Sequence, residues 1–242
     1  MAWTIPTPED QVLFLRNLQR LLAEGLFVAS YKFALVRALA DLAVLKGDDS
    51  GSPLPLDTKD IAAKFVDLLV AKTQAWSYGD PMDGKVEMGT VIDEEAAKLF
   101  EARVNEAVSQ GAKVLVGNQR RGALYSPTVV DQVRSEMTLV KQETFGPVSP
   151  VIRFKNIDEA IRVSNSTAYG LSSAVCTNRL DYIARFVSEL NVGSVNVREV
   201  PGYRLELTPF GGIKDSGLGY KEGVQEAIKS FTNIKTYSLP WV

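Results

Sequence analysis

Few side chains in this chain could act as a nucleophile or a general base. Its 242 residues include one cysteine, Cys176, and no histidine. Histidine is the commonest general base and metal ligand, so its absence excludes Ser-His-Asp triads and histidine-dependent metal sites. Cys176 lies in an apolar run, 171–177, that we predict to be a strand, where a free cysteine is usually a small buried residue. We therefore expect no catalytic residue and no metal ligand in this chain.

Three segments carry a more specific pattern. The first has Tyr-Gly-Asp-Pro-Met-Asp at 78–83, followed by Met-Gly-Thr-Val-Ile at 88–92 and Gly-Ala-Lys-Val-Leu-Val-Gly at 111–117. The second is Glu-Thr-Phe-Gly-Pro-Val at 143–148, and the third is Pro-Phe-Gly-Gly-Ile-Lys-Asp-Ser-Gly at 209–217, followed by Gly-Tyr-Lys-Glu-Gly at 219–223. In this order and spacing they resemble the aldehyde dehydrogenase superfamily, over about residues 65–242.

The resemblance implies a partial site for a nicotinamide cofactor. Glu143 matches the glutamate that hydrogen-bonds the nicotinamide ribose of NAD or NADP, and Phe145 matches the phenylalanine that packs beside the nicotinamide. A carboxylate suits this role because charge-assisted hydrogen bonds are strong. Without the family context, the segment would read as a solvated glutamate before a buried aromatic residue in a Gly-Pro turn.

The resemblance also implies two substrate-binding residues. Phe210 matches the substrate tunnel, where paired glycines let the backbone approach closely, although a Phe-Gly-Gly is often an ordinary turn. The run at 200–207 is similar to the phosphonoacetaldehyde dehydrogenase branch, in which Arg204 would hold the phosphonate through its planar guanidinium. The alternative for Arg204 is a surface ion pair with Glu206. Arg198 departs from that branch, which usually has a large aromatic residue here.

The family oxidises aldehydes through a cysteine thiolate, whose expected position falls on Gly-Asp-Asp-Ser at 47–50. No Gly-rich strand-turn-helix for a dinucleotide precedes residue 65. We therefore expect a truncated chain that is inactive alone and does not bind NAD or NADP productively.

The elements that must position these residues follow an α/β pattern from residue 57 onward. The resemblance implies the C-terminal portion of an aldehyde dehydrogenase catalytic domain, an open, mostly parallel sheet with flanking helices. We predict helices at 58–76, 93–110, 157–165, 180–190 and 220–229, and strands at 113–116, 148–154, 172–177, 193–197 and 231–239. The last strand resembles the family's oligomerisation strand, which favours a homo-oligomer; the alternative is a frayed C-terminal tail, because the hairpin that normally accompanies this strand is absent.

Residues 1–57 form a segment of different character, joined to a second part at 58–242. Two helices are predicted, one from Thr7 to Gly25 and one at 28–45, followed by a turn-rich linker at 48–55. This segment resembles the helical N-terminal part of bacterial HNH endonuclease-family proteins. It leaves two alternatives to a dehydrogenase fragment: an interaction module that docks a partner through helix 28–45, or a DNA-associated module.

Charge and composition narrow the partners. A net charge of −2 and a pI of about 5.4 give no basic surface for nucleic acid or a membrane. The apolar stretch 26–45 is interrupted by Lys32, Arg37 and Asp41, which disfavours a membrane span. No secretion signal is evident at the first residues, so we expect a cytoplasmic protein. The partner that the resemblance implies is a small-molecule aldehyde, bound by the parent family.

Overall fold

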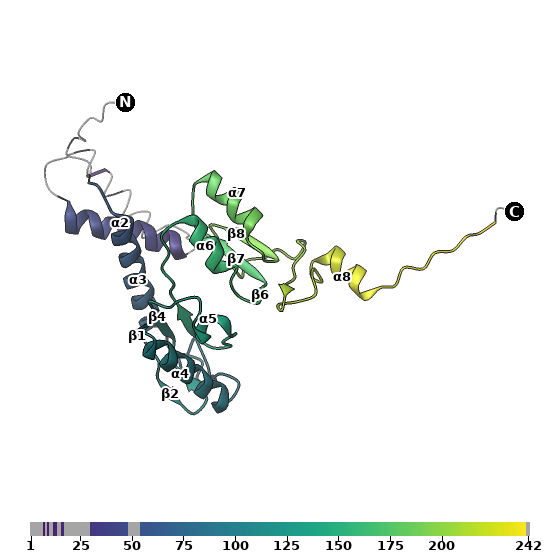
Figure 1. Cartoon of the computed structure of the whole chain (residues 1–242), viewed down its shortest axis with the longest axis horizontal. Helices are drawn as coiled ribbons and strands as arrows, with labels where there is room; N and C mark the ends of the chain where they lie inside the picture. The colour runs from purple at the N-terminus through teal and green to yellow at the C-terminus, as the bar shows by residue number, and fades with distance from the viewer. Residues whose placement is uncertain are drawn as a thin grey trace. The chain divides into compact units, whose positions relative to one another are not determined.

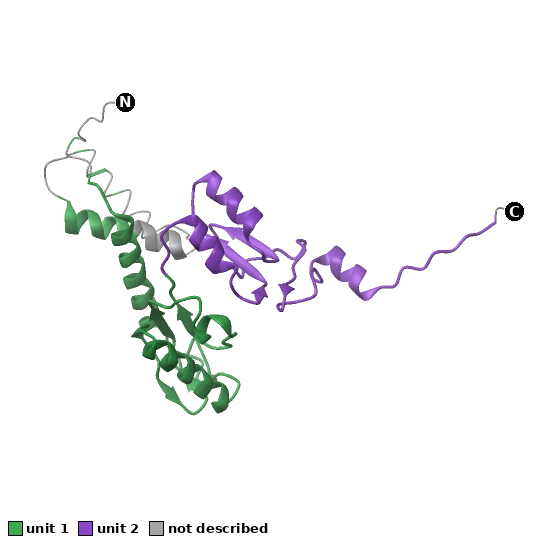
Figure 2. Ribbon diagram, viewed as in Figure 1, with its two compact units in different colours: residues 1–152 green, residues 153–242 purple. Residues whose placement is uncertain are grey.

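The fold is known from a computed structural model that describes residues 7, 9, 12, 13, 16, 30–47 and 54–240. The chain divides into two compact units, residues 1–152 and 153–242 (Figure 2). Each unit combines helices with strands, which confirms the predicted α/β class (Figure 1). Most of the predicted N-terminal helix and the linker residues 48–53 lie outside the described residues. That residues 1–57 and residues 58–242 have different origins stays a prediction.

Unit 1 is built around a three-stranded sheet with β4 in the centre. β1 pairs with β4 antiparallel, and β4 pairs with β5 parallel, with Thr128 opposite Val148. All four residues of β4 are buried. The strands of this unit are β1 (Lys113–Val116), β2 (Arg120–Arg121), β3 (Leu124–Tyr125), β4 (Thr128–Asp131) and β5 (Val148–Pro150). Its described helices are α2 (Ser30–Lys46), α3 (Thr58–Ala75), α4 (Glu94–Ser109) and α5 (Thr138–Lys141).

Side-chain caps explain where the helices of unit 1 begin. The Asp57 side chain accepts a hydrogen bond from the Lys59 amide at 2.9 Å, and the Asp93 side chain accepts one from the Ala96 amide at 2.7 Å. Each carboxylate satisfies an amide that the first helical turn leaves without a partner. α4 ends before Gly111, whose φ of +103° suits glycine. These starts at 58 and 94 agree with the predicted helices.

α4 supplies the main helical contribution to the core. Ala97, Phe100, Val104 and Ala107 recur at helical spacing and are all buried. The phenyl ring of Phe100 meets Tyr125 edge-to-face, with ring centroids 5.9 Å apart. Val104 and Ala107 belong to a second cluster of buried residues, which they form with Ala112, Val130, Val133, Met137 and Leu139.

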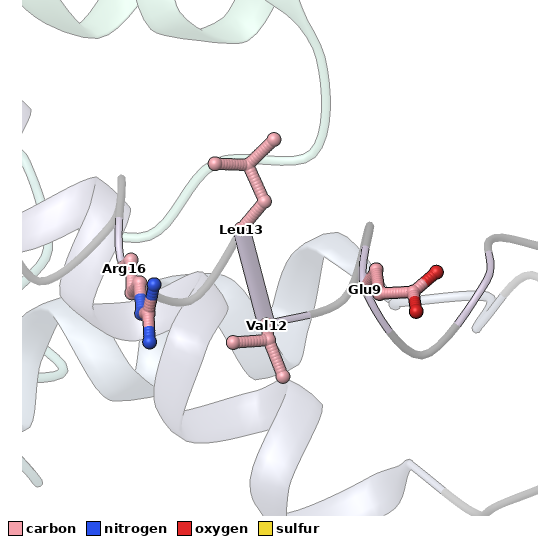
Figure 3. A pocket seen from close by; sticks show the side chains of 4 residues that line it. All are labelled: Glu9, Val12, Leu13 and Arg16. Carbon is pink, nitrogen blue, oxygen red and sulfur yellow. The ribbon is translucent and has the colours of Figure 1, made fainter.

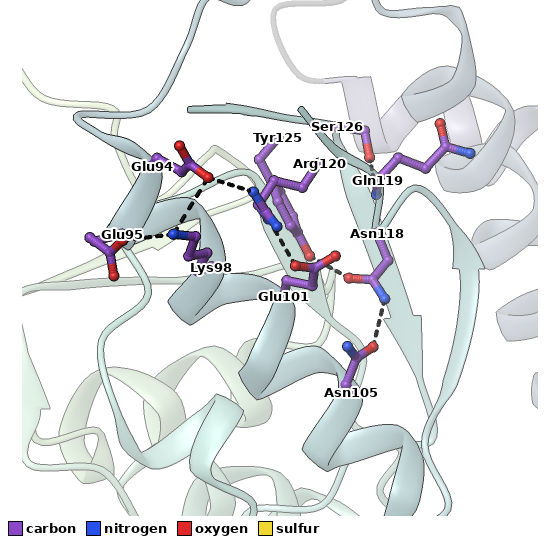
Figure 4. Close-up of polar contacts among 10 residues, drawn as sticks. All are labelled: Glu94, Glu95, Lys98, Glu101, Asn105, Asn118, Gln119, Arg120, Tyr125 and Ser126. Atoms are coloured by element: carbon purple, nitrogen blue, oxygen red, sulfur yellow. Dashed lines mark hydrogen bonds and ion pairs between the residues drawn. The ribbon is translucent and has the colours of Figure 1, made fainter. Parts of the chain in front are cut away.

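A polar network ties α4 to the β2–β3 hairpin on the solvent side of this core (Figure 4). Arg120 Nε donates to Glu101 Oε2 at 2.8 Å, and Arg120 Nη1 donates to Glu94 Oε1 at 3.3 Å. The buried hydroxyl of Tyr125 donates to Asn118 Oδ1 at 2.6 Å. Burial raises the pKa of Tyr125 to about 12, because the ionised phenolate would lose hydration there.

Unit 2 contains a strand-helix-strand unit. β7 and β8 pair in parallel, from Ser172 opposite Ser194 to Val175 opposite Val197, and α7 connects them. β6 and β9 form a separate antiparallel pair. The elements are α6 (Ile157–Ser164), β6 (Tyr169–Gly170), β7 (Ser172–Val175), α7 (Leu180–Glu189), β8 (Ser194–Val197), β9 (Ile213–Lys214) and α8 (Val224–Phe231).

The C-terminal region differs from the sequence prediction. We predicted a helix at 220–229 and a strand at 231–239, whereas α8 runs from Val224 to Phe231 and residues 232–240 form no strand. Val224, Ile228 and Phe231 lie at helical spacing, so the helix continues through Phe231. The extended residues after α8 have no neighbouring strand among the described residues. Pairing of this segment with another subunit stays a prediction.

Candidate functional site

The segment that carries Glu143 and Phe145 lies in unit 1, between α5 and β5. Arg103 of α4 holds it in place: Arg103 Nη1 donates to the Glu143 carbonyl oxygen at 2.6 Å and to Thr144 Oγ1 at 3.0 Å. The Pro147 carbonyl oxygen accepts from the Thr128 amide of β4 at 2.8 Å. The segment is therefore anchored to both the helix and the central strand.

Within this turn, Gly146 packs directly against the core. A Cβ at this position would lie 2.4 Å from Cε2 of Phe100, which is closer than side chains approach one another. The glycine lets the turn pass over the Phe100 ring. It thereby fixes the backbone on which Glu143 and Phe145 stand.

The side chains of Glu143 and Phe145 face solvent. Glu143 is exposed, and the Phe145 ring is 77% exposed. The exposed ring leaves an apolar surface available for contact with a ligand, whose burial would contribute about 1.5–3 kcal/mol. The reading of Phe145 as a buried aromatic residue in a turn is therefore wrong. An exposed carboxylate and an exposed ring, two residues apart, could accept hydrogen bonds from hydroxyl groups and pack against a planar ring.

Arg204 and Phe210 lie together in unit 2. The Arg204 guanidinium carbon lies over the Phe210 ring, 5.1 Å from its centroid. Arg204 Nη1 also forms an ion pair with Glu222 Oε2. The alternative partner suggested by the sequence, Glu206, makes no such pair. Figure 1 shows the loop that carries Arg204 and Phe210 between β8 and α8.

Asn196 of β8 anchors the start of this loop. Its Nδ2 donates to the carbonyl oxygens of Val200, Pro201 and Tyr203 at 2.9, 3.1 and 3.0 Å. Arg198, the departure from the phosphonoacetaldehyde branch, adopts a φ of +58° and donates to Asn178 Oδ1 at 3.2 Å. Arg198 is thus oriented towards the loop after β7.

The Phe-Gly-Gly segment that follows is packed through its backbone. A Cβ on Gly211 would lie 2.1 Å from the Gly219 carbonyl oxygen, and one on Gly193 would lie 1.9 Å from the Gly211 carbonyl oxygen. Lys214 continues the segment, and its Nζ donates to the Thr167 and Tyr169 carbonyl oxygens at 3.1 and 3.2 Å. The motif therefore joins three stretches of unit 2 by close backbone contact.

Cys176 is exposed and stands one residue beyond the end of β7. The prediction that it is buried within a strand is wrong, because β7 ends at Val175, which is buried in its place.

The described residues hold no group of three or more cysteine, aspartate or glutamate side chains placed to bind a metal ion. In the same part of the chain, no helix has the length and apolar character needed to span a bilayer.

A hollow of about 340 Å³ lies at the other end of the chain, lined by Glu9, Val12, Leu13 and Arg16 (Figure 3). It is open to solvent and contains none of the side chains that the motifs single out. Its two apolar residues are about half exposed. It contributes nothing to the cofactor or substrate segments described above.

Sequence reasoning missed the residues that hold these segments. Arg103 is 40 residues from Glu143, and Glu222 is 18 residues from Arg204, so local patterns do not connect them. Glu222 was visible within the Gly-Tyr-Lys-Glu-Gly run, but no role followed from it. Asn196 gave no signal beyond its place in a strand.

Comparison with known proteins defines the class. The model of the "Aldehyde dehydrogenase family" matches residues 56–237, and the chain belongs to this family. It is 40% identical over 178 residues to lactaldehyde dehydrogenase of Methanocaldococcus jannaschii, and 38% identical over 172 residues to sulfoacetaldehyde dehydrogenase of Neptuniibacter caesariensis. These matches cover 74% and 71% of the chain, but 38% of each relative, so the chain spans well under half of their length.

Solved structures agree with this assignment. Glyceraldehyde-3-phosphate dehydrogenase GapN from Methanocaldococcus jannaschii, solved with NADP, matches at a TM-score of 0.68 and 39% identity, over 73% of this chain and 38% of that one. Aldehyde dehydrogenase 21 from Physcomitrella patens, solved with succinate, matches at a TM-score of 0.64 and 35% identity, over 71% and 34%. The fold and the motifs therefore lead to the same family.

Proposed function

We propose that this chain forms the nicotinamide-ribose segment and the substrate-facing loop of an NAD(P)-dependent aldehyde dehydrogenase. The aldehyde substrate carries a tetrahedral oxyanion, as phosphonoacetaldehyde does, at the end remote from its carbonyl group. One observation carries the substrate part: the Arg204 guanidinium is half exposed and lies over the Phe210 ring. The chemistry of the oxyanion matches that guanidinium.

The cofactor part rests on the turn at 143–148. Glu143 would accept hydrogen bonds from the ribose hydroxyls, and the exposed Phe145 ring would pack beside the nicotinamide. A bound NAD or NADP supplies the hydride acceptor for aldehyde oxidation. Arg103 and Gly146 keep the turn in position for this contact.

The substrate part is supported by the chemistry of the relatives. Two relatives are named for aldehydes that carry a sulfonate: sulfoacetaldehyde dehydrogenase of Neptuniibacter caesariensis and 3-sulfolactaldehyde dehydrogenase of Priestia megaterium. A sulfonate has the same tetrahedral arrangement of oxygens as a phosphonate. Arg204 offers planar paired N–H donors that suit either group.

This chain alone is proposed not to oxidise aldehydes. Its one cysteine, Cys176, follows β7 in unit 2 and lies outside both segments. The family nucleophile is expected at 47–50, where the sequence has Gly-Asp-Asp-Ser. The endonuclease-like N-terminal helices, a cytoplasmic location, homo-oligomer formation and a role as an interaction or DNA-associated module stay predictions.

The test is an activity assay on the purified chain with phosphonoacetaldehyde and either NAD or NADP, followed by absorbance of the reduced cofactor. We expect no turnover from the wild type or from Cys176→Ala. Turnover that survives Cys176→Ala would overturn the mechanism, because no thiolate would then be needed. Binding is tested separately: any unproductive NAD(P) binding by the chain should be weakened by Phe145→Ala, whereas Phe154→Ala, also at an exposed phenylalanine, should not change it.

A further inference from the structure

Glu222 is fixed next to both proposed substrate-binding residues. Its amide donates to the Phe210 carbonyl oxygen at 3.0 Å, and the Phe210 amide donates to the Glu222 carbonyl oxygen at 3.2 Å. Its carboxylate pairs with Arg204, which lies over the Phe210 ring. The backbone and side-chain contacts of Glu222 therefore hold its carboxylate beside the guanidinium that would bind an anionic ligand.

The pair leaves part of the guanidinium available. A guanidinium has five N–H donors, and among the described residues the one hydrogen-bond acceptor for Arg204 is Glu222, through Nη1. Among the described residues, no acceptor contacts its Nε or Nη2. These two nitrogens can donate together to two oxygens of one ligand. A ligand bound there would lie close to the Glu222 carboxylate.

Charge then distinguishes between ligands of the same shape. Arg204 attracts an anion and Glu222 repels it, so Glu222 offsets part of the attraction that Arg204 exerts on a ligand. The repulsion from Glu222 doubles when the ligand carries two negative charges instead of one. Both side chains are about half exposed, at 52% and 58%, so water weakens these effects without removing them.

We propose that Glu222 tunes the charge preference of the Arg204 site, because its carboxylate lowers the affinity for a doubly charged phosphonate more than the affinity for a singly charged sulfonate. This inference rests on the proposed function, because it requires Arg204 to be the anion-binding residue. Glu222 is a specificity-determining residue that acts through Arg204. It reduces the advantage that a dianionic tetrahedral group would otherwise have over a monoanionic one at this site.

The test uses two probes that differ in charge and little in shape. Methanesulfonate carries one negative charge, and methylphosphonate carries two at about pH 9, where arginine remains protonated. Their affinities for the full chain are measured by isothermal titration calorimetry at low ionic strength. Removing a carboxylate about 6 Å away should strengthen binding by about threefold for the monoanion and about tenfold for the dianion. We expect these gains in both Glu222→Gln and Glu222→Ala.

Controls separate this inference from the proposed function. Glu206→Gln removes an acid two positions along the chain from Arg204 whose side chain makes no hydrogen bond or ion pair among the described residues, and should change the ratio of the two affinities less than the Glu222 variants do. Arg204→Gln should abolish binding of both probes; unchanged binding would refute Arg204 as the anion site. If Arg204→Gln abolishes binding but the Glu222 variants leave the ratio unchanged or weaken both probes, the charge preference is refuted and the proposed function stands. Circular dichroism checks that each variant is folded.

Discussion

Substitution of Gly146 by alanine tests whether the cofactor segment depends on the core beneath it. The added methyl group would lie 2.4 Å from Cε2 and 2.5 Å from Cδ2 of Phe100, about 1 Å closer than an ordinary contact. Phe100 is 2% exposed and packs against Tyr125, so the ring has little room to move. Overpacking of this kind typically costs about 1–3 kcal/mol. We expect Gly146→Ala to destabilise unit 1 by that amount.

Hydrogen–deuterium exchange measures this effect in each unit separately. Peptides from α4 and β4 should lose protection by about fivefold or more, since about 1 kcal/mol corresponds to a factor of about five. Peptides from β7 and β8 in unit 2 serve as the internal reference and should not change. The control is Gly84→Ala, where a Cβ would meet no atom within 4 Å and protection should stay at the wild-type level.

A double variant identifies the cause of the effect. Phe100→Leu removes the ring atoms that the new methyl group would meet, at the cost of some packing. If the clash is responsible, adding Gly146→Ala to Phe100→Leu should cost at least about 1 kcal/mol less than adding it to the wild type. Equal costs in the two backgrounds, or wild-type protection in Gly146→Ala itself, would refute the proposed contact between the turn and the core.

Two further predictions concern single side chains. Because burial raises the pKa of Tyr125 to about 12, above the ordinary value of 10.0, its stabilising contribution is complete below about pH 10 and is lost as the pH rises towards 12. Urea unfolding of the wild type should weaken over that interval, and Tyr125→Phe should lose part of this pH dependence; identical pH profiles would contradict it. Lys214→Met removes the ammonium group that donates to the Thr167 and Tyr169 carbonyl oxygens, and should destabilise unit 2 by about 1–3 kcal/mol, whereas Lys221→Met, at an exposed lysine, should not. Thermal unfolding checks this pair, and equal stability of the two variants would contradict the role of Lys214.

Sequence patterns predicted the helices well because their signals are local. Asp93 and Asn156 each cap the helix that follows, and apolar residues such as Ala97 and Phe100 recur at helical spacing within it. The parallel strands β7 and β8 also lie where short apolar runs predicted strands. Such features need no knowledge of distant parts of the chain.

Other elements could not be predicted from local pattern. The central strand β4 begins with Thr128 and ends with Asp131, both buried, so it lacks the apolar run expected of an inner strand. β2, β3, β6 and β9 have two residues each, which is too short for any periodicity. The exposure of Cys176 depends on where β7 ends, and the backbone pairing in unit 2 determines that position.

The candidate site also combines residues that local sequence patterns identify with residues that only tertiary structure brings together. The motifs singled out Glu143, Phe145, Arg204 and Phe210, and the structure shows that the last two are in contact. The residues that orient them come from other elements, as Arg103 and Glu222 do, and only tertiary structure brings them near. Sequence analysis therefore identified candidate ligand-binding residues but not the groups that hold them.

The close backbone packing around Gly211 limits which residues can replace the glycines in this part of the fold. The carbonyl oxygen of Gly219 lies where a side chain on Gly211 would be. A larger residue at position 211 would therefore force apart the stretches that this glycine joins. A chain can therefore lose its chemistry and still need these glycines in order to fold. The Phe-Gly-Gly signature in an unfamiliar protein is accordingly a marker of architecture, and catalytic competence has to be judged from other residues.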